Sequence, residues 1–166
     1  MAKKLLLVRH GKSSWKHPGL ADHERPLLKT GIERTARVGE FLLDNGIKPG
    51  LIVSSHAVRA FETARILGGV LGYPAHEILI ESNIYYYGSD GLFDLAMALP
   101  NDKEVAMLVG HNPAMTQLAN MFLEQKLDYL PTTGVVCVSI GTDKWEELPM
   151  ADRQVDFLIT PKMLET

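Results

Sequence analysis

Short apolar runs alternate with longer amphipathic segments along most of the chain. A short, continuous apolar run bounded by turn residues is typical of a strand that is buried on both faces. Such runs predict strands at residues 5–8, 51–53, 78–80 and 105–109. Apolar residues at helical spacing predict helices near residues 30–44, 57–71, 92–99 and 113–122. This alternation predicts an α/β fold, a three-layer sandwich whose mostly parallel central sheet is flanked by helices.

Capping signals mark where three of the helices are expected to begin. Residues 30–33, with the sequence TGIE, have capping-box spacing. Ser54 and Ser55 can cap the second helix, whereas Asn112 is placed to cap the last one with Pro113 at its first position. The expected buried face of the first helix consists of Ile32, Ala36, Gly39, Leu42 and Leu43.

The last third of the chain has a different pattern. An apolar run at residues 135–140 is followed by a turn at 141–143, a predicted strand near Trp145 and a further run at 155–160. Apolar segments of this length, separated by turn residues, predict hairpin-like edge strands.

Length and composition limit the class of protein. The 166 residues, 46% hydrophobic and 22% charged, fit one domain that spans residues 1–166 and buries a substantial core. A net charge of −3 is too mild to suggest a nucleic-acid partner. The single cysteine excludes an internal disulfide and favours a reducing compartment.

The N-terminal apolar run also bears on the expected location. Residues 5–8 are too few for the apolar region of a secretory signal, which takes about 7–15 residues. A membrane span needs about 20 apolar residues, and the sequence contains no such stretch. We therefore expect a soluble cytoplasmic protein without a membrane partner.

Cationic and imidazole side chains follow three of the predicted strands. Arg9 and His10 come directly after the first strand, Arg59 lies in the first turn of the next helix, and His111 follows the fourth strand. Each residue alone would most often lie on the surface without a function. Ligands of open α/β sheets bind beyond the carboxyl ends of the strands, so we expect the four to share a pocket. Arginine forks and helix N-termini predict that this pocket binds an anion with several oxygens.

The motifs that carry these residues resemble those of a known family. Arg9-His10-Gly11 resembles the RHG motif of the histidine phosphatase superfamily, and SSHAVRAFETA around Arg59 resembles its second motif. Gly110-His111 is similar to the later histidine motif. Further likeness to SixA-type phosphohistidine phosphatases lies in KSSW at 12–15, ERPL at 24–27, Thr30-Gly31 and Pro161-Lys162. The resemblance spans nearly the whole chain and implies a phosphoglycerate-mutase-like fold.

The resemblance implies a covalent mechanism. His10 is then the nucleophile that becomes phosphorylated, while Arg9, Arg59 and His111 hold the phosphoryl oxygens. Two nearby arginines are expected to lower the pKa of His10 and keep its ring neutral. Lys12 and Ser13 follow the nucleophile and can contact the phosphate or the rim of the site.

No metal or other cofactor is expected at this site. The sequence contains no HxH, HExxH or CxxC spacing, so a metal-dependent phosphatase is the weaker account.

Glu81, after the third predicted strand, loosely matches the acidic proton donor of many superfamily members. Two roles for Glu81 stay open: a proton donor to the leaving group, or a surface carboxylate that ends a strand. If Glu81 is the proton donor, Glu81→Gln should slow hydrolysis of alkyl phosphates far more than hydrolysis of phosphohistidine, whose nitrogen can arrive protonated.

The spacing of the motifs bears on the substrate. About 30 positions separate Glu81 from His111, and a predicted helix and strand occupy most of them, which leaves little chain for a lid. An open site suits phosphohistidine on a protein, for example on a phosphotransfer domain.

A small-molecule phosphomonoesterase remains the alternative enzyme. A phosphate-binding module without turnover is the alternative outside catalysis. A nucleotide-binding Rossmann-type protein is disfavoured because no GxGxxG or P-loop follows a strand.

Overall fold

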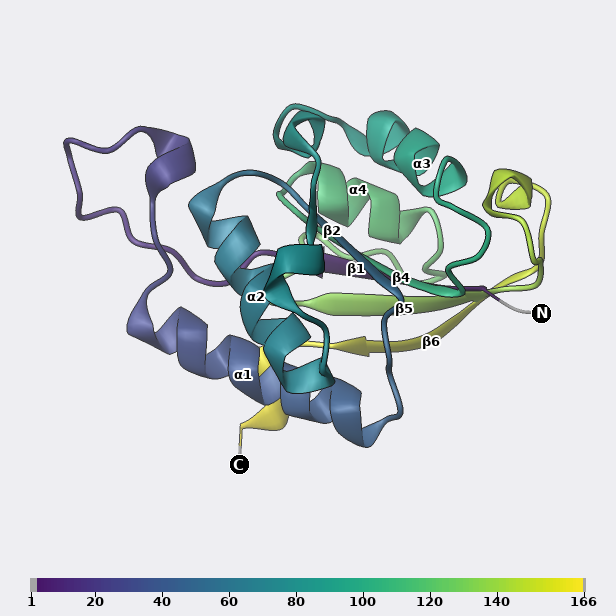
Figure 1. The fold of residues 1–166 in the computed structure, drawn as a ribbon, viewed down its shortest axis with the longest axis horizontal. Coiled ribbons are helices and arrows are strands. Elements are labelled where there is room, and N and C mark those ends of the chain that lie inside the picture. The colour runs from purple at the N-terminus through teal and green to yellow at the C-terminus, as the bar shows by residue number, and fades with distance from the viewer. Residues whose placement is uncertain (1–2, 166) are drawn as a thin grey trace.

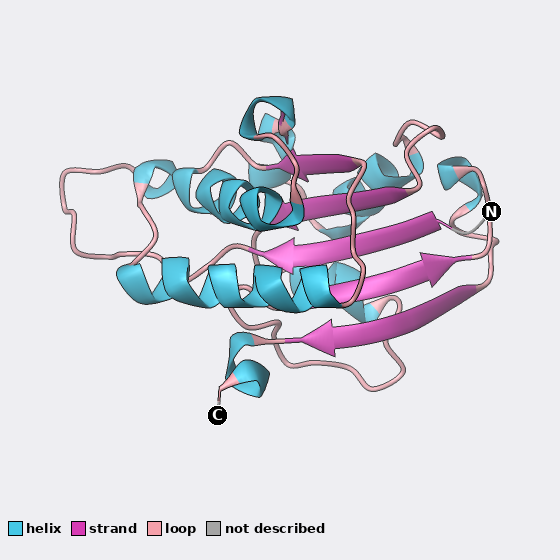
Figure 2. Ribbon diagram, turned by 60° about the horizontal axis from the view of Figure 1, so that its bottom comes forward, coloured by secondary structure: helices cyan, strands magenta, loops and turns pink. Residues whose placement is uncertain are grey.

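The apolar runs form the centre of a six-stranded sheet (Figure 1). The computed structural model describes residues 3–165. Its strands are β1 (Lys3–Arg9), β2 (Leu51–Ser54), β3 (Leu79–Ile80), β4 (Val105–Gly110), β5 (Val135–Ile140) and β6 (Arg153–Ile159). They lie side by side in the order β3-β2-β4-β1-β5-β6. β5 alone runs in the direction opposite to the other strands, as Figure 2 shows.

Helices cover both faces of this sheet, which confirms the predicted three-layer α/β architecture (Figure 1). The helices are α1 (Lys29–Asp44), α2 (Val58–Leu71), α3 (Ser89–Met97) and α4 (Ala114–Asn120). Side chains alternate across β1, so that Leu5 and Leu7 pack under α3 and α4 while Leu6 and Val8 pack under α1 and α2. None of the helices among residues 3–165 combines the length and apolar character needed to cross a bilayer.

The predicted cap of α1 and part of its predicted buried face were wrong, although Gly39 and Leu42 are buried as expected. The helix begins at Lys29 with Leu28 as N-cap and no side-chain cap, so residues 30–33 form no capping box. Ile32 and Leu43 are exposed. The buried face consists of Gly31, Thr35, Val38, Gly39 and Leu42. The cause is the close contact between α1 and the loop after β1. The helix approaches this loop at Gly31, where a Cβ would collide with the backbone carbonyl of Lys12, so the face that carries Gly31 is the buried one.

The capping predictions for α2 and α4 were correct only in part. Ala57 occupies the N-cap of α2, and the Ser55 hydroxyl accepts a hydrogen bond from its backbone N–H at 3.2 Å. At α4, the Asn112 side chain accepts from the backbone N–H of Thr116 at 3.2 Å. Pro113 is itself the N-cap, however, and helical residues start one position later than predicted.

Two predictions for the last third of the chain were also wrong. Trp145 does not lie in a strand but begins a short 3-10 helix, Trp145–Glu147, with its side chain fully buried. Its indole N–H donates to the Lys103 carbonyl at 2.9 Å, which satisfies the polar atom of this buried ring. β5 is not an edge strand either, because it lies between β1 and β6. Its residues 135–138 are buried, which suits an interior position.

Candidate active site

The sheet topology brings two strand ends together. β1 and β4 pair in parallel with Arg9 opposite Gly110, so His10 and His111 leave the sheet side by side. Their ring centroids are 5.2 Å apart. β2 pairs with the other side of β4 and leads into α2, whose first turn carries Arg59. The Nε of Arg59 lies 3.4 Å from Nε2 of His10.

His10 is nearly buried and held in one orientation. Its Nδ1 lies 2.7 Å from the Gly11 carbonyl, which can only accept, so Nδ1 carries the proton and Nε2 offers a lone pair. The pKa of His10 is lowered to about 3, mainly by burial, with smaller contributions from His111, Arg59 and Arg9. The expected neutral ring therefore has a different main cause, because burial outweighs the two arginines.

His111 and Arg9 present unpaired buried nitrogens. Nε2 of His111 lies 2.8 Å from the Ser55 hydroxyl, and burial is the main cause that lowers the pKa of His111 to about 4. One Nη of Arg9 donates to the Leu130 carbonyl at 3.1 Å. Nδ1 of His111 and Nε of Arg9 are buried without a hydrogen-bond partner in the protein. An unpaired buried polar atom costs free energy, so both are suited to bind a ligand atom.

Asp22 binds Arg59 from the long loop between β1 and α1. Its backbone carbonyl and one carboxylate oxygen accept from the Arg59 fork at 2.7 and 2.9 Å. The Tyr85 hydroxyl donates to the same carboxylate oxygen, and Nε of Arg25 donates to the other at 3.0 Å. The hydrogen bond from Tyr85, followed by those from Arg59, holds the pKa of Asp22 far below its usual range. Asp22 is therefore ionised and fixes the plane of the Arg59 guanidinium.

This Asp22 network was not predicted from the sequence. Asp22 and Tyr85 lie in short 3-10 helices that are too short to show a periodicity in the sequence, and 63 positions separate them. The ERPL segment did point to Arg25 as part of a resemblance, but not to its contact with Asp22. Tyr85 also packs edge-on against His111, with ring centroids 5.3 Å apart, so the network reaches the imidazole pair.

These side chains enclose one pocket of about 490 Å³ at the carboxyl ends of the parallel strands. Its lining residues are Arg9, His10, Lys12, Ser13, Ser14, Trp15, Lys16, Asp22, Arg25, Leu28, Arg59, His111, Asn112 and Thr132. Lys12 and Ser13 thus belong to it, and the Ser13 hydroxyl accepts from Arg25 at 2.9 Å. Five cationic side chains against one carboxylate make the pocket suited to an anion with several oxygens.

Glu81 is not part of the pocket lining. It is the N-cap of the 3-10 helix Ser82–Tyr85, and its carboxylate accepts from the backbone N–H of Asn83 at 3.2 Å. This contact favours the structural alternative for Glu81. Within residues 3–165, no group of three or more His, Cys, Asp or Glu side chains is arranged to hold a metal ion.

Comparisons with known proteins agree on one family. The model of the histidine phosphatase superfamily (branch 1) matches residues 5–83. An uncharacterised chloroplastic protein of Arabidopsis thaliana is 30% identical over 162 residues, which cover 89% of this chain and 71% of that protein. A 2,3-bisphosphoglycerate-dependent phosphoglycerate mutase of Arthrobacter is 38% identical over 68 residues, which cover 40% of this chain and 27% of the mutase.

Solved structures show the same fold over the whole length. A candidate SixA phosphohistidine phosphatase from Nakamurella multipartitia has a TM-score of 0.80 at 21% identity, with 97% of each chain covered. The protein histidine phosphatase SixA in complex with tungstate has a TM-score of 0.81 at 18% identity, with 98% of this chain and 99% of that chain covered.

Proposed function

The chain belongs to the histidine phosphatase superfamily, and we propose that it removes the phosphoryl group from phosphohistidine on a protein through a covalent intermediate on His10. The observation that carries the proposal is the neutral, buried His10 ring beside the Arg59 guanidinium in a cationic pocket. Such a pocket binds phosphate and leaves the nucleophile unprotonated at the same time.

The reaction has two steps. Nε2 of His10 attacks phosphorus, a P–N bond to His10 forms, and the bond from phosphorus to the leaving group breaks. Water then attacks phosphorus, the P–N bond to His10 breaks with its electron pair returning to Nε2, and inorganic phosphate leaves with the protons of the water, which restores neutral His10. The hydrogen bond from Nδ1 to the Gly11 carbonyl holds the ring in the required tautomer and stabilises the positive charge that develops on it.

Hydrogen-bond donors around His10 stabilise the transferred group. The Nε of Arg59, which faces Nε2 of His10, the free Nε of Arg9 and the free Nδ1 of His111 can each contact a phosphoryl oxygen. Phosphoryl transfer needs mainly positioning and charge stabilisation, and preorganised donors around a buried nucleophile supply both.

The state of the acidic group in the pocket supports a phosphohistidine substrate. A leaving alkoxide needs a proton, but Asp22 is ionised, and His10 and His111 are neutral near pH 7. The nitrogen of phosphohistidine can arrive already protonated and then leaves as a neutral imidazole. The pocket therefore suits cleavage of a P–N bond better than cleavage of an alkyl ester.

The proposal is tested by comparing substrates. Hydrolysis of a phosphohistidine-bearing protein and of an aryl phosphate is measured side by side in EDTA. We expect the larger kcat/KM for the phosphoprotein and no loss of activity in EDTA. A strong preference for small esters would instead assign the protein to small-molecule phosphomonoesterases, and phosphate binding without turnover would make it a binding module.

Glu81→Gln is expected to change hydrolysis of alkyl phosphates and of phosphohistidine by the same small factor, within about twofold. The reason is that its carboxylate caps a 3-10 helix and does not line the pocket. Steady-state kcat with both substrates provides the measurement. A loss confined to the alkyl phosphate would restore Glu81 as a proton donor.

The His10 ring is expected to stay neutral when the pH is lowered from 8 to about 5. Its folded pKa of about 3 lies below the unfolded value of 6.5, so the neutral form dominates at every pH above the folded value. Ring nitrogen shifts in NMR spectra provide the measurement, and the urea-unfolded chain, in which the same ring should titrate near 6.5, is the control. Titration of native His10 near 6.5 would contradict the proposed cause of its reactivity.

A further inference from the structure

We propose that Trp15, Tyr86 and Tyr129 form an aromatic rim around the phosphate pocket that binds apolar side chains next to the phosphohistidine of the partner protein. The inference rests on the proposed function and adds the surface that recognises a protein rather than a small phosphate. The partner is a folded protein whose phosphohistidine is flanked by apolar and acidic residues.

Exposed aromatic residues gather at the pocket. Within residues 3–165 only Trp15, Tyr86 and Tyr129 are aromatic and exposed, with 79%, 75% and 64% of their surface accessible. Trp15 lines the pocket itself. Tyr86 packs on Tyr85, the ring that contacts His111.

Tyr129 belongs to a third loop at the same site. It precedes Leu130, whose carbonyl accepts hydrogen bonds from both Arg9 and Asn112. Three separate loops thus carry an exposed aromatic residue to the same end of the sheet.

Two of the exposed rings, Trp15 and Tyr86, are also held in place. The Arg25 guanidinium lies 3.5 Å from the centroid of the Trp15 ring, and Arg25 is fixed in turn by Ser13 and Asp22. Tyr86 packs edge-on against Tyr85 at 5.1 Å. Tyrosine and tryptophan dominate the binding energy of many protein interfaces. Rings that are fixed before binding lose less conformational entropy when a partner arrives.

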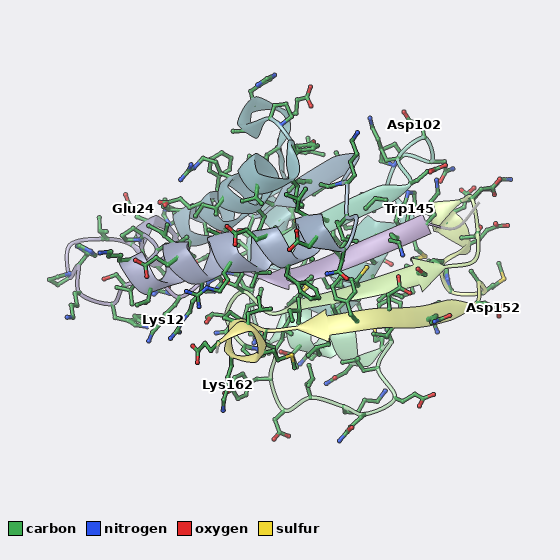
Figure 3. The ribbon with its side chains drawn as sticks, turned by 90° about the horizontal axis from the view of Figure 1, so that it is seen from below. Lys12, Glu24, Asp102, Trp145, Asp152 and Lys162 are labelled. Carbon is green, nitrogen blue, oxygen red and sulfur yellow. The ribbon has the colours of Figure 1, made fainter. Side chains whose placement is uncertain are left out.

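Depressions beside the pocket extend this surface beyond the reach of a small ester. Tyr129 lines a depression of about 410 Å³ that shares Asn112 with the phosphate pocket. Another, of about 300 Å³, shares Thr132 with the pocket and carries Lys162 and the ion pair between Arg34 and Glu165, whose atoms lie 3.8 Å apart. Figure 3 shows Lys12 and Lys162 toward the same end of the molecule. Cationic groups around an aromatic rim complement a partner surface that is apolar and acidic.

The test uses the double variant Tyr86→Ala/Tyr129→Ala, because Trp15 also lines the pocket. Its substrates share one P–N bond: free phosphohistidine, and an isolated histidine phosphotransfer domain phosphorylated with phosphoramidate. We expect kcat/KM for the phosphoprotein to fall at least about tenfold, mainly through KM, and kcat/KM for free phosphohistidine to change by less than about twofold. Met150→Ala is the control, since Met150 is 83% exposed and lies two positions from Asp152, at the opposite end in Figure 3.

Each other outcome has a distinct meaning. An equal loss on both substrates would overturn the rim and show that the tyrosines support the pocket instead. Unchanged kinetics on both would also overturn it. If the wild-type protein cleaves free phosphohistidine but not the phosphoprotein, the proposed protein substrate is wrong, whatever the variants do.

Discussion

Replacing His10 with alanine is expected to lower the turnover of every substrate on the order of 10³-fold or more and to abolish the phosphorylated enzyme. The Nε2 lone pair of this side chain lies in the pocket, 3.4 Å from the Nε of Arg59. Loss of this atom removes the covalent step, whereas the phosphate-binding groups stay. Rapid quenching with labelled substrate measures the acid-labile phosphoenzyme, and phosphate release measures turnover.

Matched variants separate loss of the nucleophile from loss of the fold. His10→Asn fills more of the buried site than alanine, so it should be equally inactive with a melting temperature closer to that of the wild type. His76→Ala replaces an exposed histidine in the 3-10 helix Ala75–Glu77 and should keep full activity. Phosphoenzyme that persists in both His10 variants would place the nucleophile elsewhere.

The parallel sheet explains why so much of the site could be predicted from the sequence. Buried parallel strands are apolar along their whole length, so their ends are visible where polar residues begin. Arg9 ends β1, His10 and His111 follow the ends of β1 and β4, and the parallel topology places those ends at one edge. The proximity of these side chains could therefore be predicted from the order of strands and helices alone, without the details of side-chain packing.

Contacts made by loops could not be predicted in this way. The bond between Asp22 and Arg59 joins an irregular loop to a helix across 37 positions, and no periodicity relates them. The exposed positions of Ile32 and Leu43 follow from the contact between Gly31 and the Lys12 backbone, which is a close approach in three dimensions. Trp145 was assigned to a strand because an isolated aromatic residue gives no period with which to distinguish strand from helix.

Arg59→Lys is expected to lower kcat/KM on the order of 10²-fold, even though the positive charge is kept. The arginine fork contacts the Asp22 carboxylate and carbonyl with its Nη atoms while its Nε faces His10. A lysine ammonium is a single point charge and cannot make these contacts at once. The measurement is kcat and KM, together with competitive inhibition by inorganic phosphate.

The control for this variant lies on the same helix. Arg65→Lys changes an exposed arginine of α2 and should leave both constants unchanged. Because Asp22 fixes the plane of Arg59, Asp22→Asn should also reduce kcat/KM, but less than Arg59→Lys does, since the Asp22 carbonyl still accepts from the fork. If Arg59→Lys retains full activity, bidentate binding by this arginine is not needed, and the charge of the pocket alone must stabilise the transferred phosphoryl group.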